Sequence, residues 1–150
     1  MIVAAYNLKG GVGKTTTAVN LATVFAQRGR SVLLVDLEAD MNASISLGVR
    51  PAQASPSIVD ALLRMRAPSD VVREVPGIPN LRLVAGGPRL ADATSLLRHV
   101  RQPERRLADV LRPLSASYDW VIVDAPAGFS IFALSIPLAV HQLLVCVPPE

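Results

Sequence analysis

The chain is 150 residues long, the size of one ordinary domain, and 51% of its residues are hydrophobic, which excludes an intrinsically disordered chain. No apolar run reaches the ~18–20 residues of a membrane span, the N-terminal segment lacks the features of a signal peptide, and the single cysteine excludes an internal disulfide framework. The formal net charge of +3 permits contact with DNA or an anionic surface without requiring it. We therefore expect a cytoplasmic protein.

Five short apolar segments predict β-strands. Most of them are continuously apolar rather than alternating, which is typical of strands that are covered on both faces of a sheet. In chain order the predicted strands are Ile2–Tyr6, Val32–Val35, Leu81–Val84, Trp120–Val123 and Leu143–Val147.

Helical patterns fill the gaps between these strands. Apolar residues recur at i, i+3, i+4 and i+7 in a helix that is expected from about Lys14 to Arg28. Three more helices are expected. The first begins at the capping box Ser57–Asp60 and carries Ile58, Leu62 and Met65 on one face, the second begins at Pro103, and the third begins near Ser130 after the fourth strand. Pro137 should kink or shorten the third helix.

The segments Met41–Pro56 and Arg66–Asn80 are expected to be surface loops.

The alternation of strands and helices predicts an α/β fold with a mainly parallel sheet, helices on both faces and a single domain over residues 1–150. In such sheets, ligands bind beyond the carboxyl ends of the strands. A glycine-rich loop follows the first strand, Asp36, Glu38 and Asp40 follow the second, and Asp124 follows the fourth. We therefore expect the loop and the acidic side chains to converge on one edge of the sheet.

The loop Lys9–Thr16 reads Lys-Gly-Gly-Val-Gly-Lys-Thr-Thr and lies between a predicted strand and a predicted helix. Its glycines let backbone N–H groups turn toward phosphate oxygens, and the helix N-terminus adds positive potential. Lys14 is expected to reach the β- and γ-phosphates of a nucleotide, and the Thr15 hydroxyl to bind Mg²⁺. The expected phosphate-binding residues are Gly10, Gly11, Val12, Gly13, Lys14, Thr15 and Thr16.

Leu8 stands where the standard P-loop pattern G-x-x-x-x-G-K-S/T has its first glycine. Residues 9–16 instead match the deviant Walker A motif K-G-G-x-G-K-S/T, in which a second lysine opens the loop. The chain thus resembles the ParA/MinD family of P-loop ATPases, which includes DNA-partition ATPases, division-site ATPases and nitrogenase-reductase-like proteins. The resemblance continues through residues 32–44 and 118–128.

The resemblance implies a P-loop NTPase fold that uses ATP and Mg²⁺, and it assigns roles by position. Lys9 would reach the phosphates of the nucleotide in a second subunit, and Lys14 would hold the phosphates of its own. Asp124 would orient Mg²⁺ through water, and Thr15 would bind Mg²⁺ directly. Asp36 or Glu38 is a further candidate for contact with the metal. The expected catalytic residues are Lys9, Lys14, Glu38 and Asp124.

Glu38 departs from the family pattern. Partition ATPases usually have an aspartate at this position, which places the attacking water, and the extra methylene of glutamate displaces the carboxylate. Misplacement by about 1 Å can cost ~100-fold in rate. We therefore expect ATP to bind and to turn over slowly. In the alternative interpretation, Glu38 is only a solvated charge of a loop.

The leading hypothesis is an ATP-dependent switch that dimerises with ATP and acts in plasmid or chromosome partition. Its expected partners are a centromere-binding ParB-like activator and nonspecific DNA, and it would associate with the nucleoid. Two alternatives stay open: a catalytically weak nucleotide-binding scaffold, and a relative of the division-site ATPases. Because family members extend well beyond residue 150, we expect a shortened version of the fold without the usual C-terminal part.

A basic stretch before the fourth strand is a candidate for contact with DNA. Arg101, Arg105 and Arg112 could share one face of the helix that opens at Pro103. The other interpretation is a solvated helix face, because acidic residues lie beside these arginines.

Overall fold

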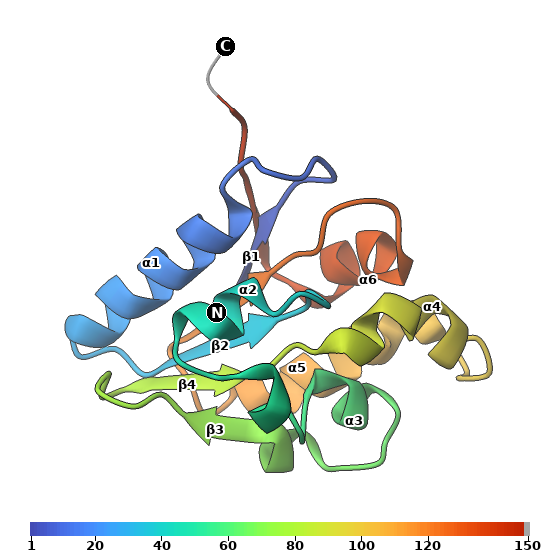
Figure 1. Cartoon of the computed structure of the whole chain (residues 1–150), viewed down its shortest axis with the longest axis horizontal. Helices are drawn as coiled ribbons and strands as arrows, with labels where there is room; N and C mark the ends of the chain where they lie inside the picture. The colour runs from blue at the N-terminus through green and yellow to red at the C-terminus, as the bar shows by residue number, and fades with distance from the viewer. Residues whose placement is uncertain (149–150) are drawn as a thin grey trace.

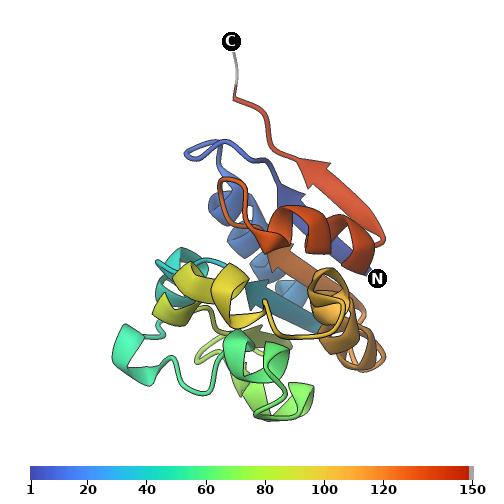
Figure 2. The ribbon, with the colours of Figure 1, turned by 90° about the vertical axis from the view of Figure 1, so that its right-hand side faces the viewer.

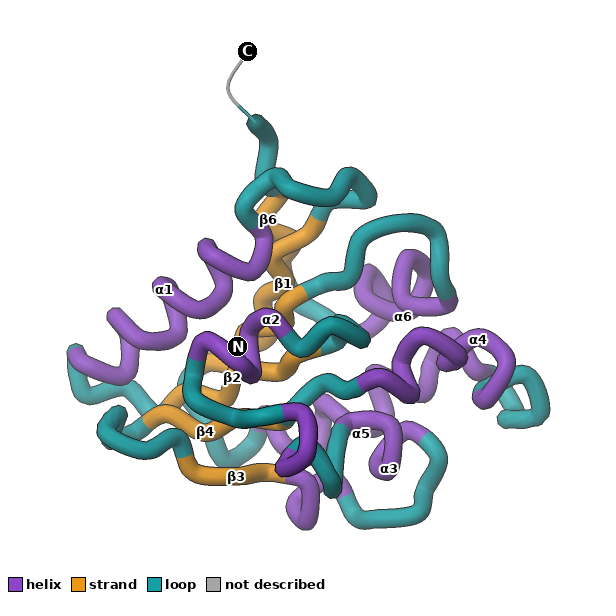
Figure 3. The backbone as a smooth tube through the Cα atoms, in the orientation of Figure 1, coloured by secondary structure: helices purple, strands orange, loops and turns teal. Residues whose placement is uncertain are grey.

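The computed structural model describes residues 1–148, and its six strands form one sheet in the order β3-β4-β2-β5-β1-β6 (Figure 1, Figure 3). Neighbouring strands are parallel except for β3 and β4, which are antiparallel. The predicted α/β fold with a mainly parallel sheet is confirmed. The strands are β1 (Ile2–Tyr6), β2 (Val32–Asp36), β3 (Val72–Glu74), β4 (Leu81–Val84), β5 (Trp120–Asp124) and β6 (Gln142–Val145).

Helices cover both faces of the sheet, so the molecule has three layers (Figure 2). On one face lie α1 (Lys14–Gln27) and α2 (Asn42–Ser46). On the other lie α3 (Ile58–Leu62), α4 (Ala93–Leu96), α5 (Arg106–Ser115) and α6 (Ile131–Ala139). Short 3₁₀ turns span Pro51–Gln53, Pro68–Val71, Pro88–Asp92 and Pro103–Arg105.

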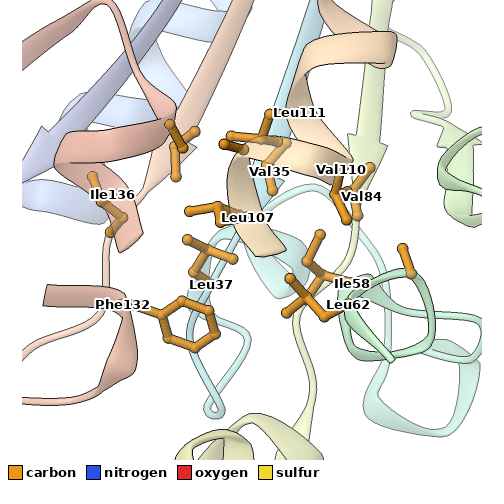
Figure 4. Packing of buried hydrophobic residues seen from close by; sticks show 14 of the residues in the cluster. Val35, Leu37, Ile58, Leu62, Val84, Leu107, Val110, Leu111, Phe132 and Ile136 are labelled. Carbon is orange, nitrogen blue, oxygen red and sulfur yellow. The ribbon is translucent and has the colours of Figure 1, made fainter. Parts of the chain in front are cut away.

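Alternation along the central strands divides the core into two halves. Val32 and Leu34 of β2 belong to the core beneath α1, whereas Leu33 and Val35 belong to the core beneath α5. Because both faces are buried, this strand needs apolar side chains at successive positions, which is the continuous pattern of the sequence. Figure 4 shows the second core, where side chains of α3, α5 and α6 pack over the ends of β2 and β4.

All five predicted strands are present, with boundaries within two residues. β6 begins one residue early and ends at Val145, two residues short of the predicted end. Its four residues are exposed, so the expectation that most strands are covered on both faces does not hold at this edge. The strand that the sequence did not reveal is β3, which has three residues, of which Arg73 and Glu74 are charged, and lies at the other edge.

The C-terminal parts of α3 and α6 depart from a regular helix. α3 stops at Leu62, and Met65, which the pattern places on the same helix face, is 62% exposed. The chain turns away because Arg64 adopts a left-handed φ of 59°. α6 ends two residues after Pro137. Since Pro137 has no N–H to donate to Ala133, the Tyr6 hydroxyl donates to that carbonyl instead (3.3 Å).

The prediction of a surface loop over Met41–Pro56 is wrong at its start. This segment contains α2, and Met41, Ala43 and Ser44 are buried. The reason is a polar contact with the sheet: the Ser44 hydroxyl donates to the carboxylate of Asp36 (2.6 Å), and the Ser44 N–H donates to it as well (2.9 Å). The second predicted loop, Arg66–Asn80, contains β3.

The proposed helix face of arginines does not form. Arg101 precedes the helix, and Arg105 lies in the 3₁₀ turn before α5, so only Arg112 is on α5 itself. Arg106, the buried arginine of this stretch, donates to the carbonyls of Leu62 and Ala61 at the end of α3 and pairs with an aspartate one turn along α5. Within residues 1–148, no helix is long and apolar enough to cross a membrane.

The loop after β4 passes close to the loop after β2, and this contact yields a stability prediction. A Cβ added to Gly86 would lie 2.5 Å from the carbonyl oxygen of Glu38 and 3.0 Å from Cγ of Asp36. We expect Gly86→Ala to lower the free energy of unfolding by about 1–3 kcal/mol, because the backbone must shift to make room. Urea unfolding without nucleotide measures the change. Gly87→Ala, whose Cβ meets its nearest atoms at 4.0 Å, is the matched control; equal losses in both variants would contradict the argument.

Candidate functional site

The glycine loop leaves β1 and turns sharply into α1. Gly11 and Gly13 adopt left-handed φ angles of 71° and 86°, which side chains rarely allow. Gly13 is the N-cap of α1, and no side chain caps the helix there. The first N–H groups of α1 thus have no side-chain acceptor. An anion at this position would accept hydrogen bonds from them and would be stabilised by the positive end of the helix dipole.

Two lysines frame this loop in different environments. Lys14 is buried (5% exposed), and its Nζ donates to the carbonyl of Lys9 (3.1 Å). Lys9 itself is exposed. A buried ammonium is costly without compensating contacts, so Lys14 is placed to receive an anion in the loop, whereas the Lys9 side chain projects into solvent.

Asp124 ends β5 as a buried carboxylate whose burial is only partly compensated. It is fully buried, and neither of its carboxylate oxygens has a hydrogen-bond partner among the described residues. Burial raises its pKa to about 7, and the carboxylates of Asp36 and Glu38 act in the same direction. The Thr15 hydroxyl and the Lys14 ammonium lower the pKa without cancelling these effects.

Asp36 lies beside Asp124 on the neighbouring strand, in register with it, but is satisfied by the protein. Its carboxylate accepts the N–H of Glu38 (2.9 Å) and both the N–H and the hydroxyl of Ser44. Burial nevertheless raises its pKa, and these hydrogen bonds oppose the rise. Of the two further candidates for Mg²⁺, Asp36 is thus already engaged in holding the loop after β2.

Glu38 is half-buried and joins two loops. Its Oε1 accepts the backbone N–H of Ala127 (3.1 Å) in the loop after β5, and its carbonyl accepts the N–H groups of Met41 and Gly87, both at 3.3 Å. Glu38 is therefore not merely a solvated charge of a loop. No pattern of residue types indicates this contact, because Ala127 contributes only its backbone.

Several of these residues line one cleft of about 630 Å³ at the carboxyl edge of the sheet. Asp36 and Asp124 are fully buried and do not line it, and Val12 and Lys9 are not part of its wall either. Asn42, Ser46 and Ala127 line it without having been predicted. Asn42 and Ala127 lie in segments that resemble the family, but neither carried an expected role. The lining residues are Gly10, Gly11, Gly13, Lys14, Thr15, Thr16, Glu38, Asp40, Asn42, Ser46 and Ala127.

The donor set fits Mg²⁺ together with phosphate oxygens. Asp124 offers carboxylate oxygens that lack any other partner, and the Thr15 hydroxyl is close enough to influence them. Within residues 1–148, no group of three or more His, Cys, Asp or Glu side chains could enclose a metal alone. That pattern suits Mg²⁺, which keeps several waters and is commonly bound by one or two protein groups and the phosphates of a substrate.

Comparison with known proteins gives the family. The family model AAA_31, described as an AAA domain, matches residues 1–150. The chain belongs to the ParA/MinD family of P-loop ATPases. It is 37% identical to the chromosome partitioning protein ParA of Myxococcus xanthus over 144 residues, which are 96% of this chain and 50% of that protein. The chain spans about half the length of the curated relatives it matches.

Solved structures agree with this ParA/MinD assignment. Cobyrinic acid a,c-diamide synthase from Mycobacterium smegmatis, solved with ADP and magnesium, has a TM-score of 0.91 and 31% identity over 97% of this chain and 59% of that one. The cell division ATPase MinD from Pyrococcus furiosus has a TM-score of 0.81 and 30% identity over 99% of this chain and 60% of its own. The ParA/MinD fold thus accounts for nearly all of the described chain.

The raised pKa of Asp124 leads to a pH-dependent difference in stability. In the unfolded chain this carboxyl ionises near pH 3.8, and in the folded chain near pH 7. Between these values the folded state holds a proton that the unfolded state has lost, so the contribution of Asp124 to stability falls as pH rises through this window. Asparagine has the same size and does not titrate.

We therefore expect Asp124→Asn, without nucleotide and Mg²⁺, to be more stable than wild type at pH 8 by up to about 4 kcal/mol. The difference should narrow steadily as pH is lowered toward 4. Urea unfolding of both proteins at intervals from pH 4 to pH 8 measures it. Identical pH profiles would mean that Asp124 ionises in the fold as readily as it does in the unfolded chain.

Proposed function

We propose that this chain is an ATP-binding and ATP-hydrolysing molecular switch that uses Mg²⁺ and dimerises with ATP. One observation carries the proposal: the buried ammonium of Lys14, in the wall of the cleft, lies close enough to the buried carboxylate of Asp124 to lower its pKa, and the N-terminus of α1 has no side-chain cap. The opposite charges are what a Mg²⁺–phosphate group requires, since Lys14 neutralises phosphate oxygens and the carboxylate attracts the metal. The relative solved with ADP and magnesium supports the same ligands.

Each predicted residue has a proposed role in this site. The backbone N–H groups of residues 10–16 hold phosphate oxygens, and Lys14 neutralises the β- and γ-phosphates. The Thr15 hydroxyl and, through water, Asp124 hold Mg²⁺, which when bound would shield the charge of the transferring phosphoryl group. Asp36 fixes the loop after β2. Glu38, at the wall of the cleft, is the candidate for orienting the attacking water.

Lys9 has a proposed role in a second subunit. Its exposed side chain leaves the rim of the loop while its carbonyl stays bound to Lys14. An ammonium delivered across a dimer would add positive charge to the phosphates of the neighbouring copy, in the manner of an arginine finger. On this proposal residues 1–150 form one P-loop domain.

We infer that the biological role is plasmid or chromosome partition. The named role of the Myxococcus xanthus relative supports it, and nonspecific DNA and a centromere-binding, ParB-like activator would then be the partners, with the protein in the cytoplasm at the nucleoid. Division-site positioning is the neighbouring alternative, since MinD shares the fold. Retention on DNA that requires ATP and weakens steeply with salt separates the two roles.

A second candidate is a nucleotide-binding scaffold with little catalysis. The contact between Glu38 and Ala127 favours it, because one of the two carboxylate oxygens is committed to a structural hydrogen bond that joins two loops. Nucleotide would then bind at the same cleft, and bound ATP or ADP would fix a conformation for a protein partner.

Solution mass tests the switch. We expect light scattering to show a dimer with Mg²⁺-ATP and a monomer with Mg²⁺-ADP or no nucleotide, and we expect Lys9→Ala to stay monomeric in all three conditions. The reason is that Lys9 supplies charge across the interface only when two triphosphates are present. If the wild type binds nucleotide tightly but stays monomeric in all three conditions, the proposed switch is overturned for this 150-residue chain and the scaffold becomes the better explanation.

Substitutions of Glu38 distinguish a slow ATPase that uses this carboxylate from a scaffold without catalysis. We expect Glu38→Asp to turn over ATP at least ~10-fold faster than wild type, because the shorter carboxylate leaves Ala127 and moves toward the position of the water. Glu38→Gln is the matched control, since it keeps an oxygen for the Ala127 N–H but has no negative charge; it should be slower than wild type. Phosphate release at saturating ATP measures all three. Equal rates in wild type, Glu38→Gln and Glu38→Ala would show that Glu38 only ties the two loops together.

A further inference from the structure

Asn7 lies between β1 and the glycine loop and joins two distant parts of the chain. Its Oδ1 accepts the backbone N–H of Lys9 (2.9 Å), and its Nδ2 donates to the carbonyl of Cys146 (2.7 Å), directly after β6. Because one partner is a donor and the other an acceptor, a single orientation of the amide satisfies both. The last paired residues of β1 and β6 are Tyr6 and Val145, so Asn7 extends the contact between these strands into the loop.

Both backbone groups of Lys9 are therefore held. Asn7 binds its N–H, and the Lys14 ammonium binds its carbonyl at 3.1 Å. The two contacts would respond differently to a bound nucleotide. Phosphate oxygens would attract the ammonium of Lys14 away from the Lys9 carbonyl, whereas they would not compete for the amide of Asn7. The amide of Asn7 is neutral and half-buried, and its other end is fixed to the sheet.

The Lys9 side chain depends on this backbone for its direction. It is exposed and flexible, and a lysine loses about 2 kcal/mol of rotamer entropy when it is fixed in one conformation. A fixed starting point limits the region that its ammonium explores. Since misplacement of a catalytic group by about 1 Å can cost ~100-fold in rate, the hydrogen bond that the Lys9 N–H donates to Asn7 matters more than its own strength suggests.

We propose that Asn7 is a positioning residue for Lys9. Its amide fixes the backbone from which Lys9 reaches the phosphates of the nucleotide in a second copy of this chain, and it does so by tying the loop to β6. This inference rests on the proposed function, which gives Lys9 its role across the dimer. It adds a residue that acts through Lys9 and does not itself touch nucleotide.

A double-mutant cycle tests this proposal with four proteins: wild type, Asn7→Ala, Lys9→Ala and the double variant. We expect Asn7→Ala to lower ATP turnover ~10-fold or more and to weaken the ATP-dependent dimer in light scattering, with a change of less than ~3-fold in the Kd for Mg²⁺-ADP. In the double variant, turnover should stay within ~2-fold of Lys9→Ala, because removing Asn7 has no further effect once its target is gone. Asn7→Ser, which keeps an acceptor for the Lys9 N–H, should recover at least ~3-fold of the loss.

The matched control is Asn20→Ala on α1. Asn20 also makes a side-chain hydrogen bond to a backbone carbonyl near the loop, from its Nδ2 to Thr16 (2.8 Å), but does not contact Lys9. Its turnover should stay within ~2-fold of wild type. ADP binding and the urea midpoint of each variant show whether it is folded.

The inference is overturned if the losses of Asn7→Ala and Lys9→Ala multiply in the double variant, or if ADP affinity falls in proportion to turnover. Either result would show that Asn7 shapes the whole loop rather than Lys9. It is also overturned if Asn7→Ala has no effect. Lys9→Ala alone tests the proposed function: wild-type turnover and dimerisation in that variant would refute the role of Lys9 across the interface, whatever Asn7→Ala does.

Discussion

The site depends on how the fold stabilises two carboxylates that lie side by side. Asp36 and Asp124 are in register at the ends of β2 and β5, and both are fully buried. Burial raises the pKa of both carboxyls, and the negative charge of Asp36 adds to the effect at Asp124. The chain satisfies Asp36 with the hydroxyl of Ser44 and two N–H groups, and it leaves Asp124 without a partner among residues 1–148. On the proposed function, Mg²⁺ near Asp124 would supply the missing positive charge, so these two identical side chains would serve different purposes.

Satisfying Asp36 also shapes the wall of the cleft. Ser44 reaches the carboxylate only because α2 folds down onto the sheet, which buries Met41 and Ala43. The Ser44 hydroxyl in turn accepts the N–H of Gly86 (3.2 Å), where a side chain would not fit. The positions of Asp40, Asn42 and Ser46 along the cleft follow from this buried contact, so the polar groups at the surface are held by a polar network underneath.

The sequence was sufficient to predict those elements that depend on local conformation or on a periodic pattern of residues. Continuous apolar segments located five strands, and the spacing of Gly11, Gly13 and Lys14 located the loop, because backbone conformation and residue type determine each other there. It failed at β3, whose three residues carry no apolar pattern. It also could not reveal the contact of Glu38 with Ala127 or of Asn7 with Cys146, which span 89 and 139 residues. In each case one partner is a backbone group, and a backbone group leaves no mark on residue type.

The loop after β5 connects these long-range contacts. The N–H of Gly128 donates to the carbonyl of Leu8 (2.8 Å), and the N–H of the preceding residue, Ala127, donates to Glu38 (3.1 Å). One short segment therefore holds both the start of the glycine loop and the loop after β2. A neutral hydrogen bond contributes only about 0.5–1.5 kcal/mol, and one to a charged group about 1.5–3 kcal/mol. Contacts of this size are individually weak, and together they hold the three loops in the described structure. Because Ala127 and Gly128 are adjacent, a displacement of either N–H would strain the contact of the other, so the position of the glycine loop and the position of Glu38 depend on the same segment.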